Sequence, residues 1–107
     1  MKSSGDTPIA CSLVTADFRD REAKLLRRFR SAVLDVEELP DGYSFRLPGD
    51  GKWIMLVAEL MAAERECCPF VTFEMAAMPN HGAVIVRVSG PEGAKEFVKT
   101  VLWKNGR

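Results

Sequence analysis

The hydrophobic positions of the chain alternate between helical and strand periods. Apolar residues three or four positions apart predict a first helix over Ala16–Ala32 and a second over Lys52–Cys67. Alternating or continuous apolar runs predict four strands, at residues 34–39, 43–47, 70–75 and 83–88. A third helical stripe predicts a last helix that begins after Ser89 and ends at residues 105–106.

Proline, glycine and capping residues mark where these elements begin and end. Pro40-Asp41-Gly42 separates the first two strands and residues 79–82 separate the last two, so each pair is expected to form a hairpin. Pro69 biases the residue before it away from the helical conformation, which ends the second helix. Thr15 is expected to cap the first helix, and the spacing of Ser89 and Glu92 predicts a capping box for the last.

The order of elements is therefore α-β-β-α-β-β-α, which predicts an α+β fold. Because hairpins pair their strands antiparallel, we expect one four-stranded antiparallel sheet with three helices mainly on one face. The β-branched run at 83–88 indicates a central strand. A chain of 107 residues is the length of one domain, so residues 1–107 are expected to form a single unit with residues 1–8 as a loose start.

Charge and hydropathy narrow the classes of partner. Fifteen basic residues balance fifteen acidic ones, so the overall charge attracts neither nucleic acid nor an anionic membrane. Six basic and three acidic residues in the first helix are interpreted as a solvated face. No apolar run reaches the length of a membrane span and the start of the chain lacks the apolar segment of a signal peptide, so the expected compartment is the cytoplasm.

The unusual chemistry is concentrated at the end of the second helix, where Cys67 and Cys68 are adjacent. A disulfide between neighbouring cysteines would be strained, and a reducing compartment favours thiols. Cys11 would supply a third sulfur if the segment around it lies beside this helix end. Three thiolates suit a soft ion such as Zn²⁺, Hg²⁺ or As(III).

Two other residues are candidate ligands. Glu64 lies one helical turn before the cysteines, on a face that should be buried, where an unpaired carboxylate would be costly. It is a candidate fourth ligand or proton acceptor. His81, the only histidine, lies in the second hairpin turn and is a candidate assisting ligand.

We therefore predict a small thiol protein that binds a soft metal or metalloid ion, or a small thiol-reactive ligand, without turnover. One alternative is a redox enzyme, because Cys11 precedes the N-terminus of the first helix, where positive charge favours a thiolate, and Cys67 or Cys68 would resolve the disulfide. Another is a non-catalytic, homodimeric interaction module, in which the cysteines are buried and inert because free cysteine packs like a small apolar residue.

Four stretches of the chain together resemble a family of small uncharacterised bacterial proteins. They are Ala10-Cys11-Ser12-Leu13, Leu39-Pro40-Asp41-Gly42-Tyr43, Glu66-Cys67-Cys68-Pro69-Phe70 and residues 90–97. The resemblance covers nearly the whole chain, and its most specific parts are the single early cysteine and the Cys-Cys-Pro-Phe segment. The family carries no established activity, so the resemblance implies only that Cys11, Cys67 and Cys68 belong to one constellation.

Overall fold

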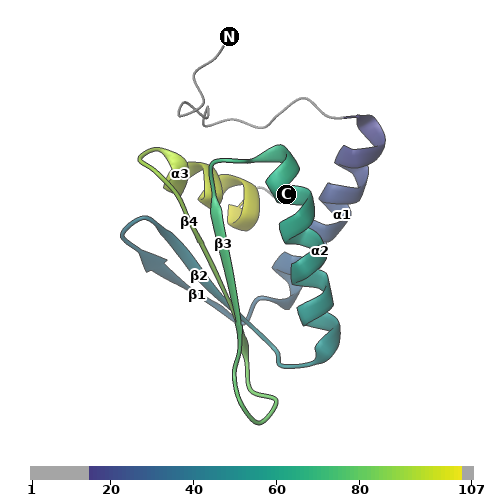
Figure 1. Cartoon of the computed structure of the whole chain (residues 1–107), viewed down its shortest axis with the longest axis vertical. Helices are drawn as coiled ribbons and strands as arrows, with labels where there is room; N and C mark the ends of the chain where they lie inside the picture. The colour runs from purple at the N-terminus through teal and green to yellow at the C-terminus, as the bar shows by residue number, and fades with distance from the viewer. Residues whose placement is uncertain (1–14, 105–107) are drawn as a thin grey trace.

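The computed structural model describes residues 15–104 and has the α+β architecture that the sequence predicts (Figure 1). Over this range no helix combines the length and apolar character that crossing a membrane would require. The elements in chain order are α1 (Ala16–Ala32), β1 (Asp35–Leu39), β2 (Gly42–Leu47), α2 (Gly51–Cys67), β3 (Thr72–Ala77), β4 (Val84–Ser89), α3 (Ala94–Val98) and η1 (Lys99–Lys104), a π-helical segment that continues α3.

The four strands form one antiparallel sheet in the order β1-β2-β4-β3. The predicted hairpins are therefore both present, and their inner strands β2 and β4 pair with each other in the middle of the sheet. In this register Phe45 of β2 lies between Val36 of β1 and Val86 of β4. The β-branched run of β4 is central, as predicted, because both of its edges are paired.

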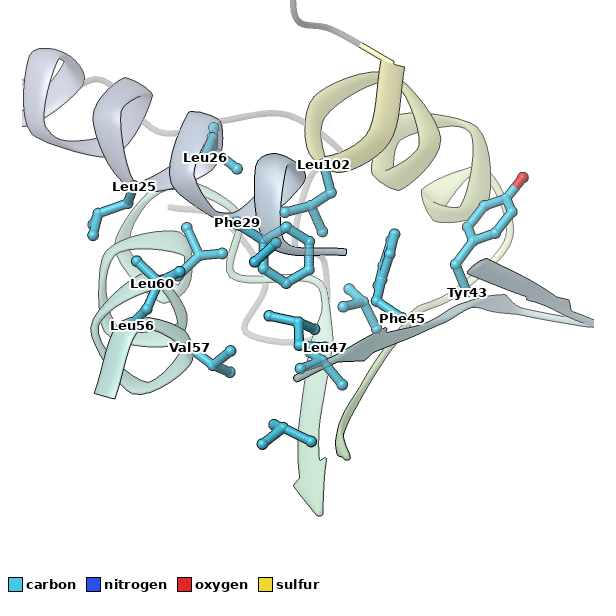
Figure 2. Close-up of a cluster of buried hydrophobic side chains, with 14 of the residues drawn as sticks. Leu25, Leu26, Phe29, Tyr43, Phe45, Leu47, Leu56, Val57, Leu60 and Leu102 are labelled. Atoms are coloured by element: carbon cyan, nitrogen blue, oxygen red, sulfur yellow. The ribbon is translucent and has the colours of Figure 1, made fainter. Parts of the chain in front are cut away.

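The core lies between one face of the sheet and the helices. Alternate residues of β2 and β4 point to this face and are almost fully buried, whereas Arg46 and Arg87 point to the other face and are exposed. Figure 2 shows Phe45 directed towards Phe29 of α1, and their rings meet edge to face with centroids 5.2 Å apart. The opposite face of the sheet is polar, with an Arg46–Asp35 ion pair at 2.7 Å.

The helix ends confirm two of the local predictions. The backbone N–H of Phe18 donates to Thr15 Oγ1 at 3.1 Å, which caps α1. Helix α2 ends at Cys67, and Cys68 leaves the helical conformation with φ −128° and ψ 73°. Pro69 accounts for this ending because its ring disfavours the helical region for the residue before it.

The predicted capping box at Ser89 and Glu92 is wrong. Ser89 is the last residue of β4 and pairs with Gly42 and Thr72, so the sheet ladder holds it in an extended conformation. Helix α3 begins only at Ala94, after Gly93 with φ 94°. Strand β3 also begins two residues later than predicted, because the chain turns at 69–70 and the N–H of Val71 donates to the carbonyl of Cys68.

Removing the central aromatic ring of the core tests this packing. Phe45 is fully buried, so Phe45→Ala should lower the free energy of unfolding by about 3–5 kcal/mol through lost apolar burial and the cavity left behind. The exposed Glu37→Gln control should change it by no more than about 0.5 kcal/mol. Urea unfolding followed by circular dichroism measures both; equal effects would show that Phe45 does not anchor the core.

Candidate functional site

The C-terminal end of α2 buries a carboxyl group beside the two cysteines. Glu64 and Cys68 are four residues apart, so the helix places their side chains on one side. The residue exposures are 2% for Glu64, 4% for Cys67 and 1% for Cys68. Among the described residues, Glu64 is the only charged residue that is buried, as its place on the apolar face of the helix predicts.

The cysteines pack in a small apolar cluster of their own, with Phe70 and Ala94. The ring of Phe70 meets the ring of Phe97 edge to face at 5.1 Å, so α3 covers the end of α2 from the C-terminal side. Cys67 and Cys68 do not form a disulfide with each other. Both sulfur atoms are therefore held in a region from which solvent is largely excluded.

A narrow cavity adjoins the Glu64 carboxyl and the Cys68 side chain. It leaves about 10 Å³ for the centre of a water molecule, which is room for no more than about one. The rest of its wall comes from apolar residues of β3, β4, α3, η1 and the segment before β3: Val71, Phe73, Val88, Phe97, Val98, Val101 and Leu102. The carboxyl group thus faces surroundings that offer it little solvation.

The two carboxyl oxygens of Glu64 have different surroundings. The Cys68 thiol donates a hydrogen bond to Oε1, with a sulfur–oxygen distance of 3.5 Å. Oε2 is buried and accepts no hydrogen bond from a donor group in the described part of the chain, and the polar group nearest to the carboxyl besides Cys68 is another carboxyl, that of Glu22. An unsatisfied polar atom in an apolar environment costs roughly 1–3 kcal/mol, so this oxygen needs either a proton to reduce its charge or a partner.

Burial raises the pKa of Glu64 from 4.5 to about 9. Part of this rise comes from the Glu22 carboxyl on α1, through a hydrogen bond between the two carboxyl groups and through the repulsion of their charges, whereas the hydrogen bond from Cys68 acts in the opposite direction. Near pH 7 the Glu64 carboxyl therefore keeps its proton. The neutral carboxyl beside the Cys68 thiol thus holds a proton that it can lose. A cation that enters here would lower the pKa of Glu64 and release that proton.

Glu22 is the member of this site that the sequence interpretation missed. The sequence predicts Glu22 on the solvated, charged face of the first helix, but the structure half-buries it and sets its carboxyl against Glu64. The spacing of Glu22 from the apolar residues indicates this position. Phe18 lies four residues before it and Phe29 seven residues after it, so all three lie on one side of the helix.

The structure does not bring His81 to the cysteines. His81 is exposed in the β3–β4 turn, where it has φ 57°. Strand β3 runs from the end of α2 towards this turn (Figure 1). At about 3.3 Å per residue, its six residues carry the chain roughly 20 Å away from the cysteines. The predicted assisting role is therefore corrected, because strand direction places His81 at the opposite end of the sheet.

The third predicted thiol, Cys11, lies outside the described residues, and its place in the site stays a prediction. Within residues 15–104 no three His, Cys, Asp or Glu side chains are grouped so as to hold a metal ion. Glu64, Cys67 and Cys68 are thus brought together as neighbours, but they do not complete a coordination shell from this part of the chain.

Comparison of the chain with protein-family models, curated proteins and solved structures found no match. The resemblance to a family of small bacterial proteins therefore stays a prediction. The chemical interpretation of the site rests on the side chains and their surroundings.

The raised pKa of Glu64 makes stability depend on pH. Between 4.5, the unfolded value, and about 9, the folded protein holds a proton that the unfolded chain has lost. Raising the pH through this window should lower the free energy of unfolding by up to about 1.4 kcal/mol per pH unit from this group. Glu64→Gln removes the titrating group, so it should flatten this dependence.

Urea unfolding of the wild type and Glu64→Gln between about pH 5 and pH 8 measures this effect. The exposed neighbour Glu66 provides a matched control, and Glu66→Gln should keep the wild-type slope. Parallel pH profiles for the wild type and Glu64→Gln would show that the buried carboxyl titrates normally.

Proposed function

We propose that this protein binds one soft metal or metalloid ion at the end of α2, without catalysing turnover. Cys67 and Cys68 supply two thiolates, and Cys11 supplies the third. Glu64, beside them, releases its carboxyl proton when the ion binds. The observation that carries the proposal is the buried Glu64 carboxyl, whose Oε1 lies 3.5 Å from the Cys68 sulfur and whose Oε2 has no hydrogen-bond donor in the described chain.

The residue chemistry supports a soft ion over a hard one. Thiolates bind Zn²⁺, Hg²⁺ or As(III) in preference to Mg²⁺ or Ca²⁺, which favour oxygen ligands. Cys67 and Cys68 lie at 4% and 1% exposure in an apolar cluster, so a bound ion would be shielded from competing water. The low polarity of this corner strengthens each charge interaction that an ion makes.

Ion binding at this site must release protons. Each thiol loses its S–H proton to solvent as the sulfur forms a bond to the ion. The positive charge of the ion also lowers the pKa of Glu64 and favours loss of its carboxyl proton. Wild-type protein should therefore release more protons per bound ion than Glu64→Gln does, and affinity should rise with pH.

The burial of the cysteines favours one competing function, a non-catalytic module in which they serve only as packing. Cys68 is 1% exposed and both cysteines contact the Phe70–Ala94 cluster, as inert cysteines commonly do. The redox alternative depends on Cys11, so it is a prediction from the sequence alone. Whether the reduced protein retains an ion, and how its thiols then react, distinguishes these three functions.

Native mass spectrometry of the reduced protein with added Zn²⁺ or Hg²⁺ tests the proposal, with proton release followed in weakly buffered solution. We expect one ion per wild-type chain, at least about tenfold weaker binding for Cys68→Ser and Cys11→Ser, and about one proton fewer per ion for Glu64→Gln. Glu66→Gln is the matched carboxyl control and should release protons as the wild type does.

Two outcomes would contradict this function. If no ion is retained and the thiols alkylate only after unfolding, the cysteines are packing residues. If no ion is retained but oxidation joins Cys11 to Cys67 or Cys68 reversibly, the protein is a thiol redox protein.

A further inference from the structure

The two edges of the sheet differ in how they are protected from further strand pairing. Strand β1 carries Asp35, Glu37 and Glu38 within five residues, and charged side chains are a common protection of an exposed edge. Strand β3 carries one charge, Glu74, pairs with β4 without a bulge and contains no proline. The β3 edge thus lacks the features that usually prevent pairing with another chain.

The register of the sheet shows which backbone groups of β3 face outwards. The N–H of Met78 donates to the carbonyl of Ala83, which makes 78 and 83 a hydrogen-bonded pair. Such pairs alternate along an antiparallel ladder, so Thr72, Glu74 and Ala76 bond to β4. The N–H and C=O groups of Phe73, Met75 and Ala77 therefore point away from the sheet, and no strand of the described residues pairs with them.

The side of α2 that runs along this edge is also incompletely covered. Ile54, Ala58, Met61 and Arg65, at steps of four, three and four residues, lie on one side of the helix, and Met61 and Arg65 share a groove with Phe73 while Ile54 shares one with Ala77; these four residues and β3 define the α2–β3 seam. Grooves of about 330 Å³ and 430 Å³ open at its two ends, the first lined by Met61 and Phe73 and the second by Ile54 and Ala77.

The apolar surface continues onto the exposed side of α2. Ala58 and Ala62 are exposed, and Met55 is 71% exposed. By contrast the exposed positions of α1 are mostly charged. The exposed side of α2 also carries charged residues, but Met55, Ala58 and Ala62 are neighbours at steps of three and four residues and form an apolar patch, which indicates a contact surface.

We propose that the α2–β3 seam binds a second copy of this chain, with the two β3 strands antiparallel about a two-fold axis at Met75. In this register Met75 lies opposite its own symmetry mate, and Phe73 lies opposite Ala77 of the second copy. Their outward N–H and C=O groups pair, so the two sheets join into one. The groove at Met61 in one copy faces the groove at Ile54 in the other.

The charged residues of β3 and β1 favour this register and favour a second copy of the chain as the partner. A two-fold axis at Glu74 would set its carboxylate opposite the symmetry-related one, which is destabilising. An axis at Met75 pairs residues 73–77 of the two β3 strands and sets Glu74 opposite Ala76, so no like charges meet. Strand β1 offers no such pairing because its three carboxylates fall within five residues. The seam is therefore complementary to itself.

Substituting the exposed Ala76 with residues of opposite charge tests the proposed register. Ala76→Glu sets two like-charge pairs with Glu74 across the interface, so it should weaken dimerisation by about 2- to 30-fold, and Ala76→Lys should strengthen it by a similar factor. Thr100→Glu and Thr100→Lys add the same charges on the exposed side of η1 and should leave the dissociation constant unchanged. Sedimentation equilibrium of the full chain measures all five proteins.

Hydrogen exchange supplies an independent readout: the amides of Phe73, Met75 and Ala77 should gain protection as protein concentration rises. A wild type that stays monomeric up to about 1 mM would overturn the proposal. A dimer that responds equally to Ala76→Glu and Ala76→Lys would also overturn it, since the contact would then lie elsewhere. Circular dichroism spectra confirm that each variant folds.

Discussion

The desolvation of one carboxyl group is the constraint on which the end of α2 depends. The helix carries Glu64 into the core on the same face as Leu60 and Cys67, where no donor in the described range serves its Oε2 and the Glu22 carboxyl lies against it. A buried carboxylate would be costly, and the folded protein limits this cost by keeping the proton, with a pKa of about 9. Proton binding, stability and the chemistry of the neighbouring thiols are therefore coupled at one place.

The fold determines both the isolation of this group and the exposure of another surface. All helices cover one face of the sheet, and α3 with η1 closes the region beside Glu64 and Cys68. The same arrangement leaves β3 at an edge, with α2 lying alongside it. The buried corner excludes solvent from the thiols of the proposed ion site, while the α2–β3 seam presents backbone groups and apolar surface to the proposed second copy.

The periodicity of the sequence was sufficient to predict the element order and the hairpins, because helices and strands each bury one regular face. It also predicted the burial of Glu64 from its position on an apolar helix face. The capping box failed because pairing of Ser89 in the ladder outweighed its local capping preference. The approach of Glu22 to Glu64 and the distance of His81 from the cysteines depend on tertiary arrangement, which local spacing does not contain.

The most direct measurement is a ¹³C NMR titration of the Glu64 side-chain carboxyl in the folded, reduced protein. We expect its resonance to stay at the position of the protonated acid through pH 7 and to titrate with a midpoint near 9, far above 4.5. A midpoint near 4.5 would contradict it, since Glu64 would then be an ordinary carboxylate and the coupling between this group, stability and ion binding would not exist.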